Sequence, residues 1–278
     1  MKTSVNTNMS AMIALQNLNK STRDLADVQN RINTGLKVAG AKDNAAIYAV
    51  AQNMRADIAS LGSVRTSLNR ATSLADVGLA AAESISDTLV RMRELVIAAR
   101  DPSLSTDSRT AYDRDFQALK RQITSIVNNA SFDGTNILNA SLNSGVNFLA
   151  DADGTQSLTL GVEDLRMSSV NVTLTTAMNL TTATNAATAL TALDASFNNV
   201  NAALARMGAS AKRIEAHTVF ITKLTDSLTG GVGNLVDADL AVESARLQAL
   251  QVKQQLGTQA LSIANQAPQV ILSLFRGG

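Results

Sequence analysis

Few residues of this chain could carry out enzymatic chemistry. The 278-residue sequence contains a single histidine, His217, and no cysteine. One histidine cannot supply the paired-histidine metal site of a metalloprotease. A chain without cysteine has no thiolate nucleophile, no cysteine-based zinc site and no disulfide bond. A lone histidine in a helical segment is more often a packed or surface residue than a catalytic one.

The carboxylates also lack a catalytic arrangement. Asp237 and Asp239 are close in sequence, but residues i and i+2 point in different directions on a helix. Both positions suit the capping of a helix N-terminus better. The sequence has no glycine-rich loop between a strand and a helix that could bind a phosphate. We therefore expect no enzymatic activity, no cofactor and no metal site.

Composition limits the partners as well. The chain carries 24 basic and 23 acidic side chains, interspersed along the sequence. Nucleic acids and anionic membranes attract clustered positive charge, so we expect neither as a partner. The first 20 residues lack the apolar core of a secretory signal peptide, which predicts export without a cleaved leader. Residues 254–275 are uncharged but contain six Gln and Asn residues. These would be costly in lipid, so we expect no membrane insertion.

The spacing of apolar residues predicts a mainly α-helical protein. Only two prolines occur, Pro102 and Pro268, so long helices are allowed. Beyond the N-terminal segment, helical periodicity covers residues 43–100, 107–131, 186–227 and 237–274. Residues 105–107 offer N-caps. The glycine cluster at 230–233 is expected to separate the last two helices.

The middle of the chain, residues 140–185, is rich in Thr, Ser and Asn instead. Residues 148–160 predict a β-hairpin around a turn that contains Gly154. The predicted fold is therefore mainly α, an elongated antiparallel helical bundle and coiled coil with a small β-hairpin region. The N- and C-terminal helices are expected to pair.

Both ends of the chain are long and uncharged. No charged residue lies between Lys2 and Lys20 or between Lys253 and Arg276. The ends of soluble monomers are usually frayed and solvated, so uncharged, helically patterned ends favour burial against other protein. The N-terminal segment has a coiled-coil seam with a seven-residue repeat, formed by Leu15, Leu18, Leu25, Val28 and Ile32.

The final helix carries two apolar stripes on different faces. The first stripe contains Leu240, Leu247, Leu250, Leu261, Ala264, Ile271 and Phe275, and the second contains Leu256, Ile263 and Val270. One partner helix cannot cover both stripes. The helix is therefore either the buried centre of an ordinary bundle or the assembly surface of a polymer. The uncharged N-terminal end favours assembly, so we predict that both sets of residues form a polymerisation interface.

Several short motifs occur along the chain. They are Asn-Thr-Asn at 6–8, Ala-Leu-Gln-Asn-Leu at 14–18, Arg-Ile-Asn-Thr-Gly at 31–35, Lys-Asp-Asn-Ala-Ala at 42–46, Arg-Met-Arg-Glu-Leu at 91–95, Phe-Asp-Gly at 132–134, Asp-Ala-Asp-Leu-Ala-Val-Glu at 237–243 and Ala-Asn-Gln-Ala-Pro-Gln at 264–269. Their order and content resemble those of bacterial flagellins. Asn44 and Asp133 depart from the residues common in the family, but both keep a short polar turn former. The nearest alternative is the hook–filament junction protein, whose ends resemble those of flagellin. A secreted monomeric helical-bundle adhesin or effector is the other.

The resemblance implies a structural subunit that self-assembles into a helical filament for motility. Residues 1–35 and 236–278 would form a coiled-coil polymerisation domain at the inner tube. Residues 36–139 and 186–235 would form a helical bundle, and residues 140–185 a short, variable, surface-facing region without large outer domains. The expected partners are other copies of the chain, the flagellar export apparatus, an export chaperone, the filament cap and hook-junction proteins. The expected location is the extracellular filament.

Two further kinds of site follow from the resemblance. Animal receptors sense flagellins through a helix face that corresponds to Arg91, Leu95 and Asp115, and a plant receptor senses the segment that matches residues 30–51. Packing between subunits is the alternative role of these residues. Flagellins are also often O-glycosylated in the region of the threonine cluster Thr173, Thr175, Thr176, Thr181, Thr182 and Thr184. The alternative is that threonine simply suits exposed strands and turns.

Overall fold

The computed structural model describes residues 7–142 and 144–276, with side chains up to residue 266 in the last helix. The chain divides into two compact units. The terminal unit comprises Met1–Ala56 and Ser227–Gly278, and the central unit comprises Asp57–Asp226.

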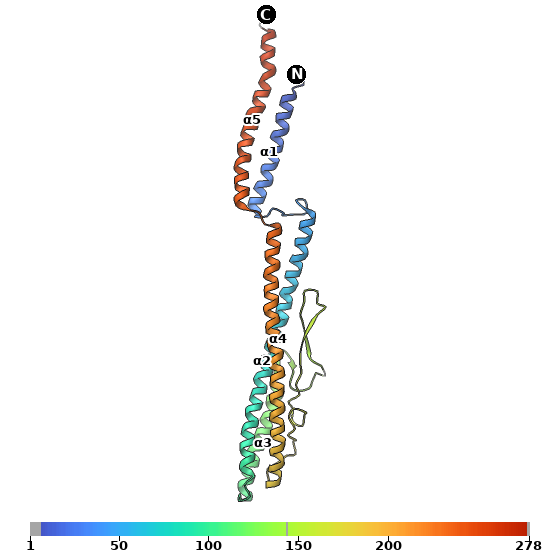
Figure 1. Cartoon of the computed structure of the whole chain (residues 1–278), viewed down its shortest axis with the longest axis vertical. Helices are drawn as coiled ribbons and strands as arrows, with labels where there is room; N and C mark the ends of the chain where they lie inside the picture. The colour runs from blue at the N-terminus through green and yellow to red at the C-terminus, as the bar shows by residue number, and fades with distance from the viewer. Residues whose placement is uncertain (1–6, 143, 277–278) are drawn as a thin grey trace. The chain divides into compact units, whose positions relative to one another are not determined.

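Helices dominate the structure, which confirms the predicted fold class. In chain order the elements are α1 (Met9–Thr34), α2 (Ala45–Ala99), α3 (Thr106–Asn129), β1 (Ser131–Phe132), β2 (Thr135–Asn136), β3 (Val146–Leu149), β4 (Ser157–Leu160), α4 (Ala183–Val236) and α5 (Leu240–Arg276) (Figure 1). The strands form two separate antiparallel pairs, β1–β2 and β3–β4. The predicted hairpin over residues 148–160 is the β3–β4 pair.

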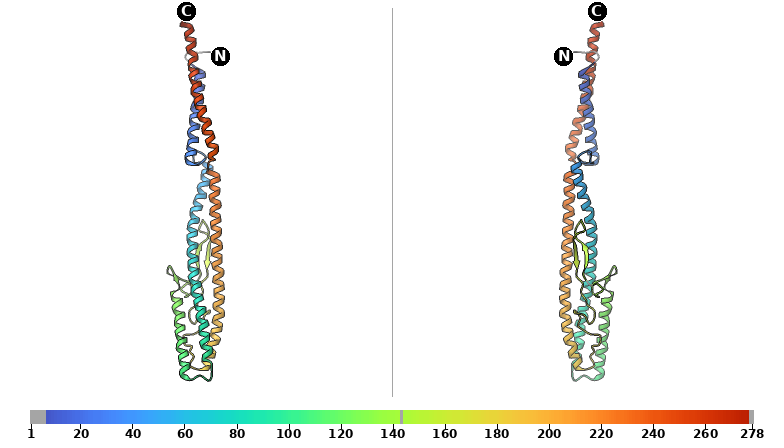
Figure 2. Two further views of the ribbon diagram at one scale, coloured as in Figure 1. Left: turned by 90° about the vertical axis from the view of Figure 1, so that its left-hand side faces the viewer. Right: turned by 90° about the vertical axis from the view of Figure 1, so that its right-hand side faces the viewer.

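In the terminal unit, α1 and α5 lie side by side and antiparallel (Figures 1 and 2). This arrangement confirms the predicted pairing of the N- and C-terminal helices. Asn8 caps α1 by accepting a hydrogen bond from the Ala11 amide at 3.1 Å. The helix ends at Gly35, whose φ of 71° is a left-handed conformation that glycine adopts without strain.

Backbone hydrogen bonds tie together the two linkers of the terminal unit. The Ala238 amide donates to the Gly35 carbonyl, and the Lys37 amide donates to the Val236 carbonyl, both at 2.8 Å. These bonds form an isolated antiparallel bridge between Leu36 and Asp237. The linker after α1 is therefore fixed against the linker before α5, and this contact sets where the two terminal helices start to pair.

The central unit is built around α3 and the parts of α2 and α4 within residues 57–226, which run side by side (Figure 2). Its core consists of apolar side chains with almost no exposed surface. They include Leu68, Ile85 and Met92 of α2, Phe116 and Ile123 of α3, and Val200 and Ile214 of α4. Buried aliphatic and aromatic side chains of this kind supply most of the stability of a helical bundle.

The segment between β4 and α4 contributes to this core, although its composition suggested a surface loop. Leu160, Leu165, Val172, Leu174 and Leu180 are all fully buried. The side chain of Lys120 on α3 fastens the segment by donating to the carbonyls of Thr176 and Met178 at 2.7 and 2.9 Å. Burial lowers the pKa of the Lys120 ammonium. The segment is therefore held by specific polar contacts as well as by apolar packing.

One sequence expectation was wrong. The glycine cluster at 230–233 does not end the helix, because α4 continues through it to Val236. Each helical glycine costs about 1 kcal/mol relative to alanine, so the local sequence favours a break. Packing overrides this preference, since Val232 and Val236 are buried one turn apart. Gly231 also lies against Met54, where a Cβ atom would come within 2.8 Å of the methionine Cε.

Two glycines of α2 in the central unit predict opposite effects of the same substitution. Gly62 has open space around it, whereas a Cβ at Gly78 would lie 2.6 Å from Cδ1 of the fully buried Ile137. Gly62→Ala should raise the free energy of unfolding by about 0.5–1 kcal/mol because alanine restricts the unfolded chain. Gly78→Ala should lower it by about 1–3 kcal/mol because the core is overpacked. Urea unfolding followed by circular dichroism measures both, and a Gly78→Ala chain as stable as the wild type would contradict the packing described here.

Candidate assembly interface

The seam between α1 and α5 buries one apolar face of each helix. On α1, Val28 is buried, and Leu18, Leu25 and Ile32 are half-buried. On α5 the half-buried residues of the first predicted stripe are Leu247, Leu250, Leu261 and Ala264. The helices pack tightly at Gly257, where a Cβ atom would lie 3.2 Å from Cδ1 of Leu18. The seam is therefore a narrow contact between only two helices.

Leu15 differs from the rest of the N-terminal set. Its side chain is 47% exposed, and the half-buried residue at this level of α1 is Ala14. From Leu25, alternating steps of four and three residues lead to Ser21, Leu18 and Ala14. Leu15 therefore lies about 100° around the helix from the seam. Leu15 was predicted to belong to the seam because leucine is more apolar than the neighbouring Ala14.

The second predicted stripe of α5 is exposed in the single chain. Leu256 is 58% exposed and Ile263 is 69% exposed. Other large apolar residues of the same two helices are also exposed, namely Met9, Met12, Ile13 and Leu15 on α1 and Leu240, Val242 and Val252 on α5. Apolar surface gathered on one part of a protein commonly marks an interaction site. The backbone of α5 continues helically to Arg276, but the side chains of Val270, Ile271 and Phe275 lie outside the described residues.

A buried charge cluster joins the two helices near the linkers, and the sequence reasoning missed it. The Glu243 carboxylate is 5% exposed, and its Oε1 atom accepts from Arg31 at 3.4 Å and from Arg246 at 3.0 Å. Its other oxygen, Oε2, is buried and has no hydrogen-bond partner among the described residues. Arg31 and Glu243 belong to two of the motifs quoted above, and opposite charges in motifs from both chain ends were the available signal. Removing one member of such a buried pair is strongly destabilising.

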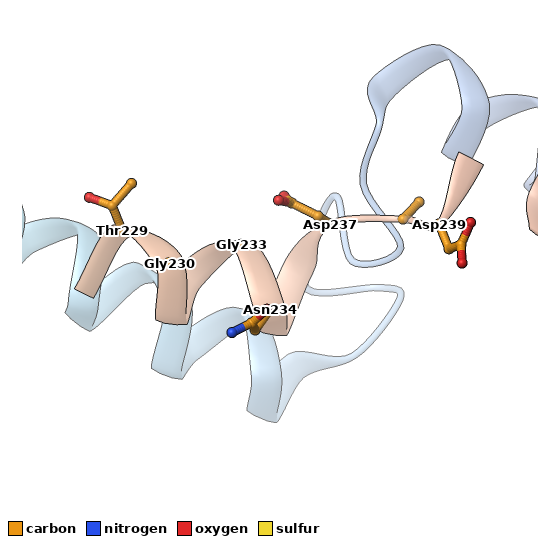
Figure 3. Close-up of a pocket in the computed structure, with 7 residues that line it drawn as sticks. Thr229, Gly230, Gly233, Asn234, Asp237 and Asp239 are labelled. Carbon is orange, nitrogen blue, oxygen red and sulfur yellow. The ribbon is translucent and has the colours of Figure 1, made fainter. Parts of the chain in front are cut away.

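The two neighbouring aspartates have a structural role in this arrangement. The Asp239 carboxylate accepts from the amides of Ala241 and Val242 at 3.0 and 3.2 Å, which caps α5 as expected. Asp237 instead lies beside Gly233, where a Cβ atom would be 2.8 Å from its Oδ2. Both aspartates line a shallow hollow of about 480 Å³ with Gly233, Thr229 and neighbouring residues, and Figure 3 shows their carboxylates pointing in different directions.

Other chemical features of the described residues are few. His217 is half-buried on α4, with its Nε2 atom 2.7 Å from the Ala150 carbonyl and its ring 5.8 Å from that of Phe220. Within the described part of the chain, no group of three or more potential metal-ligating side chains occurs. The helices of that part also contain no stretch that is long and apolar enough to span a membrane.

The residues predicted for host recognition and glycosylation lie in the central unit. Arg91 is exposed and Leu95 half-buried, one turn apart on α2, and Asp115 is exposed on α3. Five threonines of the cluster are exposed, namely Thr175, Thr176, Thr181, Thr182 and Thr184. Thr173 is half-buried instead, and its hydroxyl donates to the Ala192 carbonyl at 2.9 Å. The structure therefore separates Thr173 from the other members of the cluster.

Comparisons of the chain with family models and with known proteins all identify the same family. The model of the bacterial flagellin N-terminal helical region matches residues 5–143, and the model of the C-terminal helical region matches residues 190–275. Flagellin FljJ of Caulobacter vibrioides is 49% identical over 280 residues, covering 100% of both chains. A flagellin of Brucella melitensis is 34% identical over 286 residues, covering 99% of both chains.

A solved structure shares the fold at low sequence identity. The structure of a putative flagellar hook-associated protein from Vibrio parahaemolyticus has a TM-score of 0.54 and 12% identity, and covers 70% of this chain and 100% of that chain. The length agreement with the Caulobacter protein also shows that this is a short form without a large outer domain. With both terminal helical regions matched and relatives similar over their whole length, the chain belongs to the bacterial flagellins, the structural subunits of flagellar filaments.

Proposed function

We propose that this subunit polymerises through the exposed apolar faces of α1 and α5. The observation that carries the proposal is the second stripe of α5, in which Leu256 and Ile263 are more than half exposed within the uncharged stretch 254–275. The first stripe already has α1 as its partner. Neighbouring copies of the chain are the available partners for the second stripe in a filament.

The energetics of the terminal helices support this proposal. Ordering a residue costs about 1–2 kcal/mol of backbone entropy, and a fully buried large apolar side chain contributes about 1.5–3 kcal/mol. The seam leaves most of its leucines only half-buried, so a single α1–α5 pair recovers a small part of that cost. Subunits that cover the exposed faces would supply the rest. Folding of the terminal helices is then coupled to assembly.

The same proposal assigns a role to each part of the chain. Residues 1–35 and 236–278 form the coiled-coil polymerisation domain at the inner tube, residues 36–139 and 186–235 form the helical bundle, and residues 140–185 form the outward-facing region. The flagellin family supports export through the flagellar export apparatus with a chaperone on α5, addition beneath the filament cap, contact with hook-junction proteins and an extracellular location. The role is structural rather than enzymatic.

We also propose the host-recognition and glycosylation sites that the flagellin resemblance implies. Exposure of Arg91 and Asp115 is compatible with receptor contact or with packing between subunits. For the threonine cluster, an exposed side chain is required for modification. Thr175, Thr176, Thr181, Thr182 and Thr184 are exposed, and Thr173 is half-buried.

Substitutions on the two stripes of α5 should have different effects. Ile263→Asp should leave the unfolding free energy of the single chain within about 0.5 kcal/mol of the wild type, because the side chain is exposed there. It should nevertheless abolish filaments, because each subunit would bring an unpaired charge into an apolar contact. Leu261→Asp should abolish filaments and also weaken the α1–α5 pair. Seeded polymerisation observed by electron microscopy measures the outcome.

The matched control is Ile263→Val, which keeps the stripe apolar and should polymerise normally. Central-unit folding, followed by circular dichroism, should be retained in all three variants. Straight, normal filaments of Ile263→Asp would show that this stripe faces solvent in the filament. The proposed interface would then be limited to the seam.

Amide hydrogen exchange tests the coupling between folding and assembly. In the isolated subunit, amides of α1 and of residues 240–266 of α5 should exchange much faster than those of the buried core of α2, α3 and α4, because few contacts hold the terminal pair. The same terminal amides should become protected in filaments. Slow exchange throughout both terminal helices of the isolated subunit would show that they fold independently of assembly.

Peptide mapping of native filaments tests the threonine proposal. If the threonine cluster carries an O-glycan, the mass increase should fall on the five exposed threonines and not on Thr173, which is half-buried and whose hydroxyl donates to the Ala192 carbonyl of α4. An intact mass of 29.1 kDa, the mass of the unmodified chain, would rule out the modification. A glycan on Thr173 would contradict the environment described for this side chain.

A further inference from the structure

The charges of the terminal helix pair gather at one end of it. Residues 7–19, which include the start of α1, and residues 254–266 of α5 contain no charged side chain. The charged side chains of residues 7–266 in the pair lie nearer the linkers, on α1 as Lys20, Arg23, Asp24, Asp27 and Arg31 and on α5 as Glu243, Arg246 and Lys253. Over the residues whose side chains are described, the pair therefore has an uncharged tip and a charged base. Apolar contacts dominate any association of this described tip, whereas the base offers electrostatic contacts.

A groove of about 330 Å³ runs between the two helices at this charged base. Asp24, Asp27 and Arg31 line it on α1, and Arg246, Leu250 and Lys253 line it on α5. Arg31 and Arg246 both contact the buried Glu243 carboxylate. The remaining charges give the groove an acidic lip on α1, formed by Asp24 and Asp27, and a basic lip on α5, formed by Lys253 with the exposed part of Arg246.

Three charged side chains of the two lips have no oppositely charged partner among the described residues. Asp24, Asp27 and Lys253 are exposed. Among the described residues, none of these three forms an ion pair within 4.0 Å. The helices thus present opposite charges on the two sides of one groove, and both signs remain available to another molecule.

We propose that the charged groove is an inter-subunit contact, in which the acidic lip of one copy lies against the basic lip of the next. This inference rests on the proposed polymerisation through α1 and α5 and adds what fixes its register. Apolar faces supply affinity but tolerate sliding, whereas complementary charges fix register and exclude wrong alignments. A surface that carries one acidic and one basic lip repeats head to tail, which is the heterologous contact that builds open helical polymers.

The surroundings of the groove favour a second copy of the chain as its occupant. Next to Lys253 on α5, Val252 and Leu256 are 55% and 58% exposed, so the basic lip is continuous with the apolar stripe proposed for assembly. Nucleic acids or anionic membranes require lips of the same positive sign. Asp24 and Asp27 oppose both, whereas another copy supplies both signs at once.

Two charge-changed subunits test the proposal on the full chain. Asp24→Lys with Asp27→Lys makes both lips basic. Ala249→Glu with Lys253→Glu makes both lips acidic and leaves the Arg246–Glu243 pair in place; Ala249 is an exposed residue of the same groove. Each double variant alone should show a critical concentration for polymerisation at least about tenfold above that of the wild type, because like charges face each other between copies.

An equimolar mixture of the two double variants is the decisive measurement. If the lips meet between subunits, every acidic lip finds a basic one in the mixture, and copolymers should form at nearly the wild-type critical concentration. Repulsion inside each variant chain is unchanged by mixing. A mixture that fails to polymerise would therefore overturn the proposal, because the charges would then act within one chain. A double variant that polymerises alone like the wild type would overturn it as well.

Controls separate this inference from the filament function itself. Lys223→Glu with Asp226→Lys changes exposed charges of α4 in the central unit and should not alter polymerisation. Combining all four groove substitutions in one chain restores opposite lips, and this chain should polymerise alone. If the wild-type chain does not elongate filament seeds, the proposed function fails. If the wild type elongates and the mixture does not, only the groove proposal fails.

Discussion

A single helix partner can cover only one face of a long apolar helix, and this constraint underlies the arrangement of the whole molecule. The seam with α1 covers the stripe of α5 that contains Leu247 and Leu261, and leaves Ile263 69% exposed. Adding a third helix within the chain would satisfy α5 and end the need for other subunits. Among the described residues of the terminal unit, the other helices are α2 and α4, and these contribute only their ends there.

An incompletely covered helix pair must be positioned by contacts other than apolar packing. The Leu36–Asp237 bridge joins the two linkers by backbone hydrogen bonds. Glu243 then joins the bases of α1 and α5 through Arg31 and Arg246. Because Glu243 is buried, sliding one helix along the other would break its ion pair with Arg31 and leave it only Arg246, which lies on the same helix. These polar contacts define the start of the seam, and the apolar residues extend it.

The sequence was most informative where one periodic pattern acted over many residues. The helices, the end of α1 at Gly35, the hairpin around Gly154 and the two stripes of α5 were all predictable from spacing and turn chemistry. The continuity of α4 was not, because three glycines in residues 230–233 favour a break and only the burial of Val232 and Val236 opposes it. The Glu243 cluster was also hidden, since its partners Arg31 and Glu243 are 212 residues apart.

The packing of residues 160–180 shows a different limit. Leu165, Val172 and Leu174 have no helical or strand repeat that identifies them as core, yet all three are fully buried. Polar contacts explain their position, because Lys120 binds the carbonyls of Thr176 and Met178 and Asp113 accepts from the Leu180 amide. Such contacts depend on where α3 lies after folding. A composition rich in threonine therefore described the exposed side of this segment and not its buried side.

The stability of the two units therefore depends differently on subunit concentration. The central unit buries its core within one chain, so its stability is independent of subunit concentration. The exposed faces of α1 and α5 can be covered only by other molecules, and stabilisation by a binding partner grows with its concentration. In the proposed filament, the subunit would be partly open when dilute and fully ordered where subunits are concentrated. The apolar tip of the helix pair would then provide the affinity, and the charged base the alignment.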